Sequence, residues 1–264
     1  MTSRAARLLE AALRAGGDPE RAAGSKRYLK SELEHLGVRV PEVRRLACAT
    51  AAEAGSRAEL DALVDRLWAR PVFECRLAAA MALEARPDLV TAAELARIRR
   101  MVHEAGTWAI VDVLAVKVLG ALLTARPEAA PRLDGWARDG DFWVRRAALL
   151  SQIEPLKAGA PFDRFAAYAE AMLEEREFFI RKAIGWVLRE AAKTRGEEVY
   201  AWLAPRASRA SGVTMREAVK YLPPARRERL LAATRDARDG RGRPGEQGTR
   251  PARRRARSSA RGRG

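Results

Sequence analysis

The sequence has few cysteines, histidines, lysines and aromatic residues, and these shortages exclude several classes of protein. Its 264 residues include two cysteines and two histidines, and aromatic residues make up 6% of the chain. Two cysteines cannot form the disulfide framework of a small extracellular domain, and no CxxC motif or Cys/His cluster is present. Cys48 and Cys75 lie in apolar helical patterns, which favours reduced thiols in a cytoplasmic protein. We therefore predict no disulfide and no metal site.

Motifs of the common enzyme classes are also missing. The chain has no Ser-His-Asp or Cys-His arrangement, no P-loop and no GxGxxG motif, so acyl transfer and nucleoside triphosphate chemistry are poor candidates. His35 and His103 are isolated, and we expect them to be surface or capping residues. No segment reaches about 18 uncharged apolar residues, and the charged N-terminus lacks the apolar core of a signal peptide. We therefore expect no membrane span and a cytoplasmic location.

Positive charge is abundant. The formal net charge is +16 and the pI is near 10.9, which favours a polyanionic partner, either nucleic acid or an anionic membrane surface. Residues 240–264 hold nine arginines and one acid, Glu246, so this segment carries +8 and residues 1–239 carry the other +8. Seven of the 50 basic residues are lysines, consistent with a genomic preference for arginine, so no single arginine is evidence of a function. The body of the protein is basic even without its tail.

Helical periodicity runs almost end to end without an alternating strand pattern, so we predict an all-α protein. Two helices, over 3–15 and 26–36, precede a series of helical pairs. The first helices of these pairs begin near Pro41, Val72, Thr107, Asp141, Glu177 and Val213, which lie 31 to 36 residues apart. This period, and the similarity of DFWVRRAALL (141–150) to the DxxVRxAAxxAL core of HEAT repeats, predicts a right-handed α-solenoid of HEAT-like pairs. We place the folded domain at 1–237 and a disordered arginine-rich tail at 238–264.

One position near the end of the first turn carries a cation in five of the six first helices. The cations are Arg44, Arg45, Arg76, Arg145, Arg146, Arg181, Lys182 and Arg216. Equivalent positions of a solenoid line one surface, usually the concave one, so this pattern predicts a curved basic groove. Trp143 and Trp186 lie at helical contact spacing from Arg146 and Lys182, which places both rings in the same groove.

The central pair differs, because its nearest polar residue at that position is Asp112. Trp108 and Asp112 are four residues apart in GTWAIVDVLAVKV (106–118), so a helix places them on one face, although the rest of that helix is apolar. Two interpretations remain open. Asp112 is either a functional acid or a polar partner for a neighbouring helix. In the second case the arginines bridge units and the tryptophans fill gaps between helices, as we expect for Trp68, Trp136 and Trp202.

Several motifs resemble those of one known family. They are LWARP (67–71), WAIVD (108–112), FWVRRAA (142–148) and EFFIRKAIGWVLRE (177–190), with YLK (28–30), GVRVP (37–41) and REAVK (216–220) on either side. Over about residues 20–235, the sequence resembles the DNA alkylation repair glycosylases of the AlkD type. The resemblance implies a HEAT-like solenoid that removes N3- and N7-alkylated purines from duplex DNA without a metal or organic cofactor.

The resemblance also implies roles for individual residues. Trp108 and Trp186 match the aromatic residues that flank the lesion nucleotide, and Asp112 matches the catalytic acid. Arg146 matches the arginine beside that acid, which contacts the DNA backbone. Ala109 stands where some members carry a bulkier or charged residue, a position that bears on lesion preference. We expect a monomer that is associated with the nucleoid when it is bound to DNA.

The chemistry of such a lesion explains how one acid can suffice. An N3- or N7-alkylated purine is cationic, so it leaves without a general acid and produces an oxocarbenium-like sugar. A carboxylate near that sugar stabilises its charge and orients a water, aromatic faces favour the cationic base, and groove arginines bind phosphates. No lysine beside Asp112 is suited to a Schiff base, which favours a monofunctional glycosylase without lyase activity.

The alternative function is a non-catalytic HEAT-repeat module that binds nucleic acid or a protein, since solenoid folds serve both purposes. The environment of Asp112 distinguishes the two. A solvent-open Asp112 on the same surface as Trp108 and Trp186 favours the enzyme. An Asp112 that is buried against a neighbouring repeat favours the module.

Overall fold

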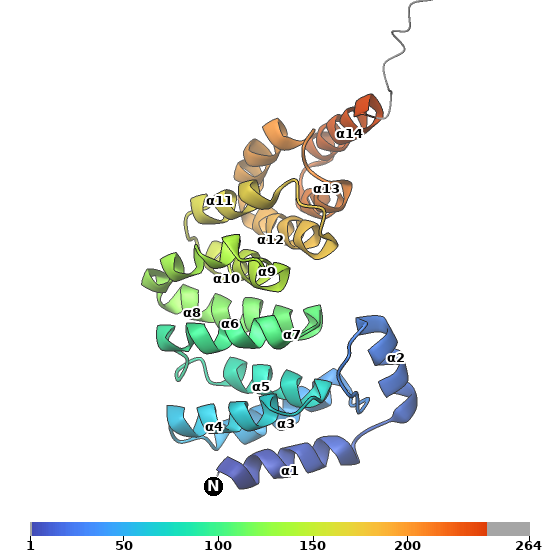
Figure 1. Cartoon of the computed structure of the whole chain (residues 1–264). Coiled ribbons are helices and arrows are strands. Elements are labelled where there is room, and N and C mark those ends of the chain that lie inside the picture. Colours follow the sequence, from blue (N-terminus) through green and yellow to red (C-terminus); the bar gives the residue numbers. More distant parts are fainter. Residues whose placement is uncertain (1, 242–264) are drawn as a thin grey trace, which may run out of the picture.

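The computed structural model describes residues 2–241, and these residues form a stack of helices. Figure 1 shows the stack, with α1 (Thr2–Ala15) at one end and α14 (Pro224–Arg241) at the other. No strand occurs within the described residues, although an isolated β-bridge joins Glu34 and Val72. The all-α prediction is therefore confirmed, and the stacking is consistent with the predicted solenoid.

The helices follow one another as pairs along this stack. The first members are α3 (Val40–Ala52), α5 (Phe73–Ala85), α7 (Trp108–Asp112), α9 (Phe142–Leu150), α12 (Phe178–Leu203) and α13 (Gly212–Ala218). Each begins within one residue of the start predicted for it. Consecutive first members pack against each other from α3 through α13, and we call this continuous series the first-helix row.

The remaining elements complete the pairs and the N-terminal end. They are α2 (Pro19–Leu29), α4 (Arg57–Trp68), η1 (Ala92–Glu94), α6 (Leu95–Glu104), η2 (Val113–Leu119), α8 (Gly120–Ala125), η3 (Pro127–Leu133), η4 (Trp136–Arg138), α10 (Ile153–Lys157), α11 (Asp163–Met172), η5 (Ala204–Arg206) and η6 (Val219–Tyr221). Among these, η2 is π-helical and the other η segments are 3₁₀ turns.

Side-chain caps set the starts of three central helices in the row. Thr107 caps α7, Asp141 caps α9 and Glu177 caps α12, each by accepting a hydrogen bond from the backbone N–H two residues further on. Such a cap satisfies a donor that the first turn of a helix leaves unpaired, and it stabilises the helix by about 1 kcal/mol. Because the caps recur at intervals of 34 and 36 residues, the local sequence determines the spacing of the row.

The second helix lies earlier in the chain than predicted, over Pro19–Leu29 instead of 26–36. Asp18 caps it by accepting a hydrogen bond from the backbone N–H of Arg21, and Pro19 occupies its first position, where a missing N–H costs nothing. Lys30 has a left-handed backbone conformation (φ 50°) and ends the helix. The Gly-Gly-Asp-Pro segment therefore ends one helix and also begins the next.

Apolar side chains from both members of the pairs form a continuous core. Trp68, Trp136 and Trp202 are buried in it, which confirms their predicted packing role. Both cysteines are free thiols, as predicted. His35 is buried and stacked on the Phe73 ring, so the expectation that it lies at the surface was wrong.

One described segment, Trp108–Ala125, is long and apolar enough to cross a membrane by length and composition. It comprises α7, η2 and α8, which pack against α5, α9 and α10, and 56% of it is buried inside the molecule. It also carries two charged residues, Asp112 and Lys117. Its apolar composition is therefore explained by its position at the centre of the stack.

The last helix, α14, ends at Arg241, four residues beyond the domain boundary drawn from the sequence. The rest of the predicted tail, 242–264, lies outside the described residues.

Candidate functional site

A short helix places Asp112 near the middle of the first-helix row. Gly106 adopts a left-handed backbone (φ +64°), which glycine tolerates without strain, and the buried Thr107 then caps α7. Trp108 and Asp112 are the first and last residues of α7, so they lie one turn apart on the same face. The chain continues directly into the π-helical segment η2. Because π-helical segments are rare and often occur at functional sites, the junction at Asp112 is a candidate site.

The carboxylate of Asp112 forms a bidentate ion pair with Arg146 of the next helical pair. Nε and Nη2 of Arg146 donate to Oδ1 and Oδ2 of Asp112, each over 2.9 Å. Nη1 of Arg146 donates to the backbone carbonyl of Phe179 over 2.6 Å. The guanidinium carbon also lies 5.8 Å from the centroid of the Phe179 ring. A single arginine thus joins α7, α9 and α12.

The two partners differ in burial. Asp112 keeps 15% of its side chain exposed, whereas Arg146 keeps 3%. Burial raises the pKa of the Asp112 carboxyl above its ordinary value, and the charge and hydrogen bonds of Arg146 oppose that rise. A buried carboxyl without a neighbouring cation favours its neutral form. Arg146 is therefore the group that favours the ionised form of Asp112. The site is therefore an oriented carboxylate with a small part of its surface open to solvent.

This geometry differs from the role that the sequence suggested for Arg146. A contact with a DNA phosphate was expected, but the side chain is buried and all three of its nitrogens donate to Asp112 or Phe179. The two N–H groups that remain on Nη1 and Nη2 have little access to a phosphate, because 3% of the side chain is exposed. The structure instead gives Arg146 the role of bridging three helices and orienting Asp112. Asp112 is thus paired with a neighbouring unit, yet it is not closed off from solvent.

The three tryptophans predicted for the groove are half-buried, unlike the three in the core. Trp108 meets Tyr28 of α2 edge to face, with ring centroids 5.9 Å apart. In Figure 1, α2 stands beside the stack on the side where α7 lies, although α2 comes far earlier in the sequence. Trp186 lies beside Arg189, whose guanidinium carbon is 6.0 Å from the ring centroid. Trp108 and Trp186 therefore make separate contacts within the described part of the chain.

The third of these tryptophans, Trp143, belongs to a cluster of aromatic rings at the starts of α9 and α12. Its ring centroid lies 4.5 Å from that of Phe142 and 4.8 Å from that of Phe179. Phe178 meets Phe179 edge to face and is 52% exposed. Since the Phe179 ring also faces Arg146, this cluster flanks the ion pair of Arg146 with Asp112.

Most of the cations predicted to line the groove are bonded within the protein. Each of seven cations forms an ion pair with a carboxylate or donates a hydrogen bond to a backbone carbonyl. They are Arg44, Arg45, Arg76, Arg145, Arg146, Arg181 and Lys182. The eighth cation, Arg216, is exposed and lies at a cavity of about 520 Å³ that Arg176 and Arg181 also line. Several of these bonds join neighbouring helical pairs, so the row has fewer unpaired cations than the pattern suggested.

Three residues of this region were not among the predicted site residues. They are Tyr28, Phe179 and Glu217, which contact Trp108, Arg146 and Lys182, respectively. Each lies in a motif that carried the family resemblance. Spacing rules could not connect them with the site, because 33 to 80 residues separate each from its partner.

Comparisons with known proteins agree with this architecture. A family model described as "DNA alkylation repair enzyme" matches residues 9–222. A solved structure described as a predicted DNA alkylation repair enzyme from Enterococcus faecalis superposes with a TM-score of 0.72 at 24% sequence identity. That match covers 79% of this chain and 97% of the other chain.

Two structures from Streptococcus mutans are also similar. The one described as AlkD2 has a TM-score of 0.56 at 17% identity, over 70% of this chain and 90% of its own. The one described as smu.31, from strain UA159, has a TM-score of 0.55 at 18% identity, over 70% of this chain and 93% of its own. At these identities the structures demonstrate a shared fold alone. No curated protein matches the sequence.

Proposed function

This chain belongs to the family of DNA alkylation repair enzymes, and we propose that it is a monofunctional glycosylase that releases cationic N3- and N7-alkylated purines from duplex DNA. One observation carries the proposal. The Asp112 carboxylate is held by Arg146, one helical turn from Trp108, with part of its surface open to solvent. Such an arrangement suits a reaction that needs one fixed negative charge beside an aromatic face.

The bond that breaks joins the purine nitrogen to the sugar. Its electron pair moves to the purine, which loses its positive charge as it leaves, and an oxocarbenium-like sugar remains. A carboxylate that is oriented before the reaction stabilises this sugar most effectively, because no free energy is then spent on reorganisation. Arg146 supplies that orientation through two parallel hydrogen bonds to Asp112.

The ion pair with Arg146 leaves the Asp112 carboxylate able to accept further hydrogen bonds. A carboxylate has about four acceptor positions on its two oxygens, and Arg146 occupies two of them. The remaining positions can accept a hydrogen bond from the water that attacks the sugar. Arg146 also favours the charged form of Asp112, which is the form that stabilises a cation.

Release of 7-methylguanine or 3-methyladenine from methylated duplex DNA tests the proposal. The wild-type protein is expected to release these bases, and Asp112→Asn is expected to do so roughly 10²-fold more slowly or worse. Single-turnover rates are divided by the folded fraction of each sample, because Asp112→Asn leaves a buried arginine unpaired. No release by a folded wild-type protein that binds the duplex would reject the glycosylase.

One observation favours a second candidate, a non-catalytic module that binds nucleic acid or a protein. Asp112 is bonded to Arg146 of the neighbouring pair, which is also the arrangement expected of a helix-bridging acid. Such a module would bind its partner without releasing a base. Asp112→Asn would then lower stability alone, so the same assay separates the two candidates.

A further inference from the structure

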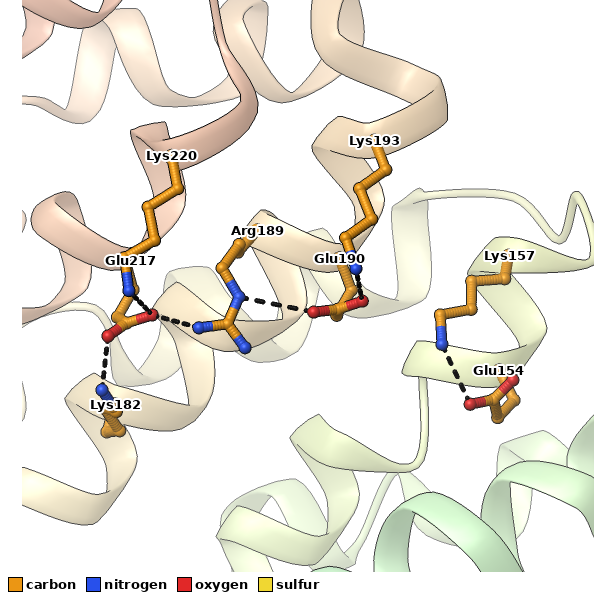
Figure 2. A network of polar contacts seen from close by, with 8 residues as sticks. All are labelled: Glu154, Lys157, Lys182, Arg189, Glu190, Lys193, Glu217 and Lys220. Atoms are coloured by element: carbon orange, nitrogen blue, oxygen red, sulfur yellow. Dashed lines mark hydrogen bonds and ion pairs between the residues drawn. The ribbon is translucent and has the colours of Figure 1, made fainter.

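A second group of charged side chains lies on α12, α13 and η6, outside the Asp112 site. The buried carboxylate of Glu217 accepts hydrogen bonds from Lys182, Arg189 and Lys220 (Figure 2). Arg189 also donates to Glu190, which pairs with Lys193 one turn further along α12. We call these six residues, Lys182, Arg189, Glu190, Lys193, Glu217 and Lys220, the Glu217 cluster.

A glycine allows α12 and α13 to approach closely enough to form the cluster. A β-carbon on Gly185 would come within 2.7 Å of both the Glu217 side chain and the backbone carbonyl oxygen of Thr214. Only glycine is compatible with such contacts. Since Lys182 and Arg189 lie on either side of Gly185 along α12, the carboxylate of Glu217 can reach both.

Glu217 is charged at neutral pH despite its burial. Burial alone would raise the pKa of Glu217, but the hydrogen bonds from Lys182 and Lys220, together with the charges of Lys182 and Arg189, lower the pKa to about 2. The carboxylate therefore holds three cationic side chains at one place.

The cluster continues the face of α12 that begins at the Asp112 site. Phe179, Lys182, Trp186 and Arg189 follow at intervals of three, four and three residues, which is the spacing of one helical face. Phe179 accepts a hydrogen bond from the arginine that holds Asp112. At about 1.5 Å per residue, Arg189 lies about 15 Å along the helix from Phe179, a distance comparable with about four base-pair steps of 3.4 Å.

The cluster has a surplus of positive charge that faces solvent. Its four cations meet two carboxylates, which leaves two positive charges. The side chains of Lys182, Lys193 and Lys220 are 40%, 41% and 50% exposed, respectively. An ammonium group has three N–H donors, so each lysine that bonds a carboxylate can still donate to a ligand. The cluster differs from the ion pair of Arg146 in its exposure, because 3% of the Arg146 side chain is open to solvent.

Lysine itself is concentrated here. The chain uses arginine at 43 of its 50 basic positions, yet three of its seven lysines belong to the Glu217 cluster. A lysine presents a compact charge whose donors rotate, whereas arginine forms fixed bidentate pairs with carboxylates. Lysine therefore suits a position that must serve an internal carboxylate and an external anion together.

We propose that the Glu217 cluster binds one backbone phosphate of the DNA strand that passes Trp186, and that Glu217 positions Lys182 and Lys220 for this contact. The inference rests on the proposed function, because it takes duplex DNA as the ligand. Glu217 itself would repel a phosphate, so it acts through the lysines. Arg189, which lies between Trp186 and Glu217, links the aromatic face to the phosphate contact.

Removing the two lysine charges tests the contact. Lys182→Gln/Lys220→Gln keeps long side chains and leaves Arg189 paired with Glu217. We expect its affinity for a short, undamaged, fluorescent duplex to fall roughly tenfold at about 50 mM salt. The slope of log affinity against log salt, measured up to about 200 mM, should fall by about one.

The matched control removes two charges from exposed positions outside the first-helix row. Arg66 of α4 and Arg132 of η3 are both exposed, and Arg66→Gln/Arg132→Gln changes the net charge by the same amount. We expect this control to keep the wild-type slope. Equal losses of slope in both double variants would mean that net charge alone decides the affinity, and would overturn the proposal.

Glu217→Gln gives the sharper test, because net charge and local organisation predict opposite results. Removing a negative charge from a basic protein should tighten DNA binding if net charge decides. If Glu217 positions the lysines, binding should instead weaken about threefold, with a smaller salt slope. Tighter binding by folded Glu217→Gln would overturn the positioning role. If this variant does not fold, the lysine double variant still decides the phosphate contact.

Base release on the same preparations separates this inference from the proposed function. If the wild type releases methylated purines while the lysine double variant binds DNA as the control does, the phosphate contact alone is rejected. If the wild type releases no base while the lysine pair governs duplex binding, the glycosylase alone is rejected.

Discussion

Asp112 and Arg146 lie 34 residues apart in the sequence and hold each other through two hydrogen bonds of 2.9 Å between α7 and α9. The arginine is the more deeply buried partner, with 3% of its side chain exposed against 15% for the aspartate. Arg146 therefore depends on Asp112 to balance its charge, and Asp112 depends on Arg146 to remain ionised. A change in either residue alters the other, and experiments on the site have to separate the two effects.

Asp112→Asn should lower both the stability of the fold and the rate of base release. Asparagine cannot balance the buried guanidinium, and breaking one side of a buried pair costs about 3 kcal/mol or more. Loss of a fixed electrostatic stabiliser should slow release by roughly 10²-fold. The thermal midpoint and the single-turnover rate, measured on one preparation, report the two losses independently.

The double variant Asp112→Asn/Arg146→Met provides the control for that experiment. It removes both charges and fills the space with an apolar side chain, so most of the lost stability should return. Base release should remain slow, because the carboxylate is still missing. Recovery of release together with stability would show that Asp112 has a structural role only.

Arg146→Met alone should leave the salt dependence of DNA affinity unchanged. The side chain is bonded to Asp112 and to the Phe179 carbonyl, and with 3% of its surface exposed it is too deeply buried to contact a phosphate. Each phosphate contact contributes about one unit to the slope of log affinity against log salt. Fluorescence titrations over a range of salt concentrations measure this slope. If the slope instead decreases by about one unit, Arg146 contacts a phosphate, as the sequence suggested.

The sequence was sufficient for the helical row because the signals there are local. Thr107, Asp141 and Glu177 each cap a helix from the adjacent position, and the apolar pattern then repeats at the spacing of the pairs. The second helix was placed wrongly, because Asp18 and Pro19 resemble the end of one helix as much as the start of another. In the structure the Asp18 side chain accepts a hydrogen bond from Arg21 N–H and so begins α2, none of whose residues is buried.

The site was predictable in its residue types but not in its bonds. Trp108 and Asp112 share a face because they are four residues apart, and that relationship follows from helical geometry. The partner of Asp112 is 34 residues away, and neither period nor charge distinguishes Arg146 from Arg145 as that partner. Arg145 instead pairs with Glu175. Pairing across units depends on which face of each helix is turned inward.

Trp186→Leu should weaken discrimination between cationic and undamaged purines more than it weakens DNA binding. An aromatic face favours a cation by roughly 0.5 to 2 kcal/mol, which corresponds to about a 2- to 30-fold loss of preference for methylated DNA. Trp186→Phe is the matched control, since it keeps an aromatic face and should keep most of the preference. Competition between methylated and undamaged duplexes measures the ratio. Equal ratios for the two variants would assign Trp186 to packing.

Glu217 should make the stability of the protein depend on acid. Burial opposes the shift, but the hydrogen bonds and charges of the surrounding cations lower its folded pKa to about 2, whereas an unperturbed glutamate titrates near 4.5. The unfolded chain therefore binds the proton more readily than the folded protein. The stabilisation is complete above about pH 4.5 and is lost as the pH falls through about 2.

At about 1.4 kcal/mol per pKa unit, a difference of about 2.5 units sets an upper limit of about 3.5 kcal/mol on this stabilisation. Glu217→Gln should lower stability at neutral pH and flatten the loss of stability between about pH 4.5 and 2, as measured by thermal midpoints across that range. Glu197→Gln is a suitable control, since Glu197 is 83% exposed and its pair with Arg226 lies at the surface, so its curve should follow the wild type. A Glu217→Gln curve parallel to the wild type below pH 4.5 would mean that the three cations do not hold Glu217 in its charged form.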